Sequence, residues 1–140
     1  MALEMTKDER EAFLADVHIG VLSVSAPGRG PLSAPVWYSY EPGGDVIILT
    51  GTNAPKTAML RQQGRATLVA QSEQPPYVYV TVEGAVTLEP PVAPDTLEMA
   101  VRYLGPEMGK RYAEGGGEGS LKARLKPERW RSEDYRKLQM

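Results

Sequence analysis

The chain has 140 residues, of which 41% are hydrophobic and 24% charged, and its formal net charge at pH 7 is -2. This length is typical of one domain, and the composition is that of an ordinary globular protein rather than of a disordered or fibrous one. There is no cysteine and only one histidine, His18, which excludes disulfide scaffolds, thiolate zinc sites, cysteine nucleophiles and multi-histidine metal centres. We therefore expect a single domain over residues 1–140 that holds no metal.

Nothing in the sequence indicates a membrane or secreted protein. No apolar run approaches the roughly 20 residues of a membrane span, and the first residues lack the basic start of a signal peptide. We expect a cytoplasmic protein. The segment from Ser120 to Met140 carries seven basic and three acidic residues, so it could contact an acidic partner or phosphates. A solvated tail explains the same count, and we expect no nucleic-acid binding.

The first part of the chain predicts a helix followed by a hairpin. Thr6 and Glu9 have the spacing of a capping box, which marks a helix start. Residues 18–25 and 32–41 have the branched or alternating character of strands and flank a turn rich in glycine and proline. Pro35 cannot donate a ladder hydrogen bond, so its strand should lie at an edge or contain a bulge.

The remaining elements follow from apolar runs and periodicities separated by turn residues. Strands are predicted over 46–50, 66–71, 77–88 and 121–125, and helices over 55–63 and 95–104. The first three strands would form a meander, and the glycine-rich residues 114–119 a flexible linker. Gly84, inside the longest strand, suggests a bulge or a sharp bend of the kind that closes a barrel. Six antiparallel strands with short helices predict a small, mainly β barrel.

The most informative local segment runs from Thr50 to Thr57, where a strand leads into a helix. It combines hydroxyl groups, backbone amides at a helix start and the ammonium group of Lys56, and these features favour a bound anion. The spacing differs from that of nucleoside triphosphate-binding loops. The alternative is that Thr52 or Asn53 only caps the helix and that Lys56 is solvated.

Two further segments combine aromatic and polar groups. Pro35 leaves backbone groups unpaired beside Trp37, and flat heterocycles bind at such surfaces, although Trp37 could equally be a core residue. Trp130 and Tyr135 lie five apart in a basic segment that could stack on nucleobases, which is weak evidence in an acidic protein. The carboxylates show no spacing that would direct a pair at one substrate atom, so nothing indicates a hydrolase.

Four strings, taken together and in order, resemble the pyridoxamine 5'-phosphate oxidase-like split β-barrel superfamily, and within it the flavin/deazaflavin oxidoreductase B group. They are residues 31–38, residues 56–61 leading to Arg65, residues 82–86 and residues 130–138. The resemblance covers nearly the whole chain. It implies a six-stranded antiparallel split β-barrel with short flanking helices, and a homodimer whose cofactor lies in a cleft between the subunits.

The resemblance also implies which residues bind the cofactor. A strand would lie beside the cofactor ring, a loop would hold the phosphate with Lys56 as its cation, and the C-terminal string would close over the cleft. The implied cofactor-binding residues are Pro35, Val36, Trp37, Thr50, Gly51, Thr52, Lys56, Thr57, Trp130, Tyr135 and Lys137. Tyr38 and Tyr79 are candidates for a proton donor or a substrate contact, and no catalytic residue is assigned.

The charge of the phosphate loop indicates which cofactor to expect. The loop departs from the family pattern at Met59, where asparagine is common, and at residues 63–65, and it keeps Lys56 as its sure cation. The terminal phosphate of FMN is nearly a dianion and usually meets two or more basic groups, whereas the phosphodiester of the deazaflavin coenzyme F420 is a monoanion. Arg61 or an arginine of a partner subunit could add a second charge.

We therefore expect an oxidoreductase that transfers a hydride between coenzyme F420 and a small unsaturated organic substrate. An FMN-dependent oxidoreductase of the same family is the alternative. A non-catalytic binder of flavin or haem, and a protein that acts through its basic tail, are the other classes that the sequence leaves open.

Overall fold

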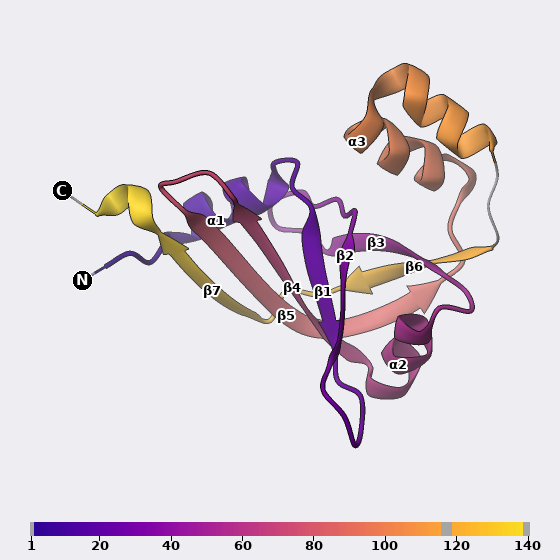
Figure 1. Cartoon of the computed structure of the whole chain (residues 1–140), viewed down its shortest axis with the longest axis horizontal. Coiled ribbons are helices and arrows are strands. Elements are labelled where there is room, and N and C mark those ends of the chain that lie inside the picture. Colours follow the sequence, from indigo (N-terminus) through magenta and orange to yellow (C-terminus); the bar gives the residue numbers. More distant parts are fainter. Residues whose placement is uncertain (1, 116–118, 139–140) are drawn as a thin grey trace.

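In the computed structural model, which describes residues 2–115 and 119–138, seven strands form a strongly curled antiparallel sheet with helices at its margins (Figure 1). The strands are β1 (Gly20–Val24), β2 (Leu32–Val36), β3 (Val46–Gly51), β4 (Arg65–Ser72), β5 (Val78–Glu89), β6 (Ser120–Leu125) and β7 (Arg129–Asp134). The helices are α1 (Lys7–Ala15), α2 (Pro55–Gln63), α3 (Ala93–Glu114) and the single 3-10 turn η1 (Tyr135–Lys137). Of the linker predicted at 114–119, residues 116–118 lie outside the described part.

The strand order is β2-β1-β4-β5-β6-β3, and β7 pairs with β5 outside this path. The predicted hairpin of β1 and β2 is confirmed, with Pro35 opposite Val21 on a strand at the sheet edge. The predicted meander is wrong, because β3 pairs along its length with β6 and keeps only the single bridge from Ile47 to Ser39. The chain leaves the sheet after Val36, and Tyr38 and Tyr40 then turn into the core.

The seventh strand, β7, is the main addition to the six strands expected. It pairs with β5, with Ser132 opposite Val80. Its inward positions include Ser132 and Asp134, both buried, so polar side chains stand where an apolar alternation would have marked a strand. The segment therefore looked like a basic tail in the sequence.

Gly84 lies where β5 changes partners. Residues 78–83 of β5 pair with β7, whereas residues 86–89 pair with β6. The chain that joins β6 to β7 crosses over this point, and a Cβ at Gly84 would lie 1.7 Å from the carbonyl oxygen of Lys126. The crossing is fixed by the Glu128 amide, which donates to the Glu83 carbonyl at 2.9 Å. The glycine is thus required by a close backbone approach at the point where the sheet curls.

The helices confirm most of the predicted end signals. Glu9 donates its amide to the Thr6 hydroxyl at 3.2 Å, and the Glu9 carboxylate accepts from the Thr6 amide at 2.8 Å, which is the expected capping box of α1. Helix α2 has the predicted bounds and ends at Gly64, whose φ of 65° suits glycine. Leu14 of α1 and Leu60 of α2 are buried against the sheet.

Helix α3 is longer than predicted and has two arms, residues 93–104 and residues 106–114. Gly105 interrupts it with a φ of 85°, and Pro106 follows. The second arm packs back onto the first so closely that a Cβ at Gly109 would lie 2.7 Å from the Cα of Val101. Figure 1 shows the two arms side by side at one end of the molecule. Neither α3 nor any other helix in the described residues is long and apolar enough to cross a membrane.

Candidate functional site

A cavity of about 1260 Å3 opens between the edge strand β2, the end of β3, the start of α2 and both arms of α3. This is slightly larger than the usual range for small-molecule sites, about 300–1,000 Å3. One wall is apolar and is made by Ile19, Pro35, Val36, Trp37, Leu49, Leu97 and Met99. The cavity therefore offers an apolar lining next to backbone that β2 leaves unpaired at the sheet edge.

The charged side chains at the cavity have one sign. Lys56 and Arg111 line it, and no carboxylate does so among the described residues. The protein as a whole has a net charge of -2, so this local excess of cations is opposed to the overall charge. A cavity with cations and low-dielectric walls attracts anions. Across residues 2–115 and 119–138, no group of three or more His, Asp or Glu side chains is arranged to hold a metal.

The loop from Thr50 to Thr57 is fixed by its own hydroxyl groups. The Thr57 hydroxyl donates to the Gly51 carbonyl at 2.6 Å and lies 2.8 Å from the Thr50 hydroxyl, and both side chains are buried. The Thr52 amide donates to the Gly119 carbonyl at 3.1 Å, which ties the loop to the start of β6. Thr50 and Gly51 also line the cavity.

This arrangement places Lys56 at the positive end of α2. The residue that caps α2 is Ala54, whose side chain makes no capping bond, and Pro55 occupies the first helical turn. The alternative that Thr52 or Asn53 caps this helix is therefore wrong. Lys56 is half-buried and lines the cavity, rather than extending into bulk solvent.

Trp37 is neither a core residue nor a free aromatic surface. Its ring stacks on Tyr103 with centroids 5.1 Å apart and planes 7° apart. Tyr112 packs against it at a tilt of 49°, with centroids 5.3 Å apart. One tyrosine comes from each arm of α3, so Trp37 is the point where the strand end and the helix meet. Tyr112 remains 58% exposed.

The first arm of α3 is held by backbone carbonyl groups near the cavity. The Tyr103 hydroxyl donates to the His18 carbonyl at 2.6 Å, and Arg102 donates to the Tyr38 carbonyl at 2.9 Å. Arg102 also reaches the Ala15 carbonyl at 3.1 Å. These bonds anchor α3 over the ends of α1 and β2, which keeps the helix beside the cavity.

The three C-terminal residues expected at the cofactor do not line this cavity of the single chain. Trp130 packs below the guanidinium of Arg10, whose Cζ lies 4.8 Å from the ring centroid. Lys137 donates to the Glu9 carboxylate at 2.6 Å, and the Tyr135 hydroxyl donates to Glu133 at 3.0 Å. In Figure 1 both chain ends lie at the end of the sheet opposite α3.

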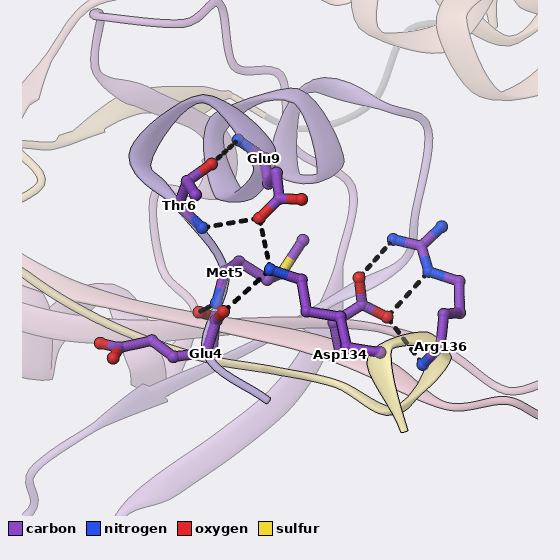
Figure 2. Close-up of polar contacts among 8 residues, drawn as sticks. Glu4, Met5, Thr6, Glu9, Asp134 and Arg136 are labelled. Carbon is purple, nitrogen blue, oxygen red and sulfur yellow. Dashed lines mark hydrogen bonds and ion pairs between the residues drawn. The ribbon is translucent and has the colours of Figure 1, made fainter. Parts of the chain in front are cut away.

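These terminal residues form a clasp between the two ends of the chain. The Met5 amide donates to the Ser132 hydroxyl at 3.0 Å. Figure 2 shows the buried Asp134 facing Arg136, which donates to it from its amide and its guanidinium at 2.8–2.9 Å. The hydrogen bonds from Arg136 hold the pKa of Asp134 below its ordinary value. The clasp uses two of the basic residues of the tail, Arg136 and Lys137, in contacts within the chain.

The two tyrosines expected as proton donors or substrate contacts, Tyr38 and Tyr79, do not reach the cavity. The Tyr38 side chain is fully buried and its hydroxyl donates to the Leu14 carbonyl at 2.7 Å, and burial raises its pKa. Tyr112 and Arg111 do line the cavity, and sequence reasoning missed both because it ended the helix at residue 104. Pro106 was a signal for the second arm in the sequence, because proline is common at the first position of a helix and Pro106 begins that arm.

No family model and no curated protein matches this sequence. Solved structures do match. One is the conserved hypothetical protein Rv2991 of Mycobacterium tuberculosis, with a TM-score of 0.78 and 23% identity over 96% of this chain and 88% of that one. A candidate pyridoxamine 5'-phosphate oxidase of Listeria innocua matches with a TM-score of 0.69 and 16% identity, over 90% and 96% of the two chains.

A third similar structure is named as an F420 reductase and has a TM-score of 0.68 and 18% identity, over 86% of this chain and 94% of that one. The chain has the split β-barrel fold. The architecture implied by the sequence resemblance is therefore confirmed. At these identities the likeness shows the fold alone. The evidence for a function of this split barrel is therefore its cavity.

Proposed function

We propose that this split-barrel protein is an oxidoreductase that binds a flavin-type cofactor, coenzyme F420, and transfers a hydride between it and a small unsaturated organic substrate. The observation that carries the proposal is one cavity in which Lys56, at the positive end of α2, lies with the apolar surface of Pro35, Val36 and Trp37. The similarity to a structure named as an F420 reductase supports the choice of F420 as the cofactor.

The residues at the cavity fit such a cofactor. Lys56 and the positive end of α2 would hold the phosphate, and the neutral backbone at Gly51 leaves room for it. Pro35 and Val36 offer an apolar surface to a planar ring. When bound, a reduced deazaflavin supplies the hydride, and the chain contributes position and electrostatics.

The chain orients the ligand through parts that are already rigid. The hydroxyl pair of Thr50 and Thr57 fixes the loop before α2, so the backbone that carries Lys56 need not rearrange when an anion binds. The apolar side chains of Leu49 and Met99 line the same cavity and would keep water from the bound ring.

We propose in addition that the protein works as a homodimer. Val17, Ile19 and Val21, at alternate positions leading into β1, are 54%, 51% and 38% exposed, and Ile19 also lines the cavity. A partner subunit that covered this apolar stripe would close the cavity on its open side. A molar mass of one chain in light scattering, in the presence of cofactor, would contradict this.

FMN is the second candidate cofactor, and Arg111 favours it. The loop alone provides one cation, which suits the monoanionic phosphodiester of F420, but the cavity as a whole contains Lys56 and Arg111. Two cations also suit the nearly dianionic phosphate of FMN. The loop charge by itself therefore does not separate the two cofactors.

Turnover tests the proposed function. Reduced F420, and separately reduced FMN, would be mixed with the purified protein and with enones, quinones and tetrapyrroles, and cofactor oxidation would be followed by absorbance. We expect oxidation to depend on protein and on one substrate class, to fall in Lys56→Ala, and to persist in Lys110→Ala, whose ammonium pairs with Glu114. Cofactor binding without turnover on any substrate would instead indicate a carrier protein. Loss of a protein partner on replacement of the exposed Arg129 and Arg131 of β7 by glutamine, with cofactor affinity intact, would indicate a tail-mediated function.

A further inference from the structure

We infer that Arg111, on the second arm of α3, binds a second anionic charge of the ligand, so that the cavity selects a cofactor whose tail carries two or more negative charges. The inference rests on the proposed function and goes beyond it, because it concerns a residue of α3 that lies outside the phosphate loop. It also names a ligand property that the loop does not determine.

The position of Arg111 follows from three features of α3. The break at Gly105 reverses the helix, and the contact of Gly109 with Val101 sets how closely the second arm returns. Tyr112, the next residue after Arg111, then packs on Trp37 of the cavity wall. These contacts bring Arg111 to the same cavity as Lys56, although 54 positions separate them in the chain.

The part of the chain that the structure describes brings no protein anion to Arg111, which leaves its charge available to an anion of the ligand. Among the described residues, the Arg111 side chain has no hydrogen bond or ion pair to another residue, and no carboxylate lines the cavity beside it. Its neighbour Lys110 differs, because the Lys110 ammonium lies 3.9 Å from the Glu114 carboxylate and does not line the cavity. The two adjacent cations of one arm therefore have different surroundings.

The two cations at the cavity have complementary chemistry. A lysine ammonium is a compact charge that suits one phosphate oxygen, whereas an arginine guanidinium presents a planar set of donors that can bind two oxygens at once. Together they match a nearly dianionic phosphate or a phosphodiester accompanied by a carboxylate. A ligand with the same ring and no anionic tail would use neither cation.

Binding of charged and uncharged ligands to matched variants tests this. The probes are F420, FMN, and their phosphate-free counterparts, the deazaflavin chromophore and riboflavin, titrated into wild-type protein, Arg111→Gln and Lys110→Gln. We expect Arg111→Gln to weaken binding of the preferred phosphorylated cofactor by about ten- to hundredfold. Lys110→Gln should bind as the wild type does, and the phosphate-free ligands should bind all three proteins equally weakly.

Salt provides an independent readout. Raising the ionic strength should weaken cofactor binding to the wild type more than to Arg111→Gln, because one charge interaction is missing in the variant. Arg111 is exposed, so the variant should unfold at the wild-type temperature. Equal cofactor affinity of the wild type and Arg111→Gln would overturn this inference and leave the proposed function intact. If neither F420 nor FMN bound to the wild type, both proposals would be wrong.

Discussion

At the scale of single residues, the neighbours of Lys56 determine where its ammonium group lies. Buried threonine hydroxyls hold the loop before it, and Ala54 and Pro55 begin the helix without using a side chain as a cap. The ammonium group is therefore available to a ligand at the positive end of α2. Removing it should cost binding energy and leave the fold unchanged.

We predict that Lys56→Ala weakens cofactor binding by about 1.5–3 kcal/mol, the range for a hydrogen bond to a charged group. Isothermal titration of wild type and variant with the same cofactor measures the difference. Lys110→Ala is the control, since Lys110 is an exposed cation that does not line the cavity. An unchanged affinity in Lys56→Ala would remove this residue from the site.

Trp37 reports on the apolar lining of the cavity. We predict that its fluorescence is quenched when cofactor is added, because a bound ring would lie within contact distance of the indole and its tyrosine neighbours. A Trp130→Phe background isolates the signal, since Trp130 is the other tryptophan of the chain. Emission that does not change at saturating cofactor would assign Trp37 to a purely structural role.

At the scale of elements, the sequence was informative wherever a local signal matched the final contact. The capping box of α1, the proline and glycine that bound α2, and the hairpin with Pro35 at its edge were all predicted from local chemistry. The pairing of β3 with β6 was not, because partner choice between distant strands has no local signal. β7 was missed because Ser132 and Asp134 occupy its inward positions.

For the candidate site, the residues of the strands and the loop were predicted, whereas those of α3 were not. Pro35, Val36, Trp37, Thr50, Gly51 and Lys56 were expected to share a site, and they do line one cavity. The contribution of α3 was missed, because the apolar periodicity predicted a helix over 95–104 only, whereas the helix reverses at Gly105 into a second arm. The grouping of Trp130, Tyr135 and Lys137 with the cofactor stays a prediction that depends on a partner subunit.

The reversal of α3 makes Gly109 a test of how the second arm shapes the cavity. A methyl group at this position would meet the backbone of Val101, so we predict that Gly109→Ala displaces Tyr112 and lowers stability by about 1–3 kcal/mol. Urea unfolding measures the loss, and cofactor titration measures the effect on the cavity. Gly30→Ala is the control, since no atom lies within 4 Å of a Cβ there. Equal stability of Gly109→Ala and wild type would contradict the packing of the two arms.

At the scale of the whole molecule, α3, which lines the cavity, and the two chain ends, which form the clasp, lie at opposite ends of the molecule (Figure 1). The clasp joins the chain ends through the bonds from the Met5 amide to Ser132, from the Asp134 amide to the Leu3 carbonyl and from Lys137 to Glu9. The buried Asp134 carboxylate binds Arg136, two residues further along the same end. The clasp should therefore contribute to stability in a pH-dependent way and have little direct effect on binding at the cavity.

The hydrogen bonds from Arg136 lower the pKa of Asp134 in the folded state, so the unfolded chain takes up this proton first as the pH falls. The stabilisation is present above the unfolded value, about 3.9, and is lost as the pH drops through the lower folded value. We predict that the free energy of unfolding falls more steeply between about pH 5 and pH 2 in wild type than in Asp134→Asn. Urea titrations at several pH values check this, and parallel curves for the two proteins would contradict it.

The central claim is that the cavity between β2, β3, α2 and α3 holds the anionic tail of a redox cofactor against Lys56. A crystal structure of the protein with F420, or with FMN if that cofactor binds more tightly, tests it most directly. The account predicts a phosphate oxygen within hydrogen-bonding distance of the Lys56 ammonium and the ring against Pro35 and Val36. A cofactor bound elsewhere on the molecule, with this cavity filled by the protein's own side chains, would contradict it.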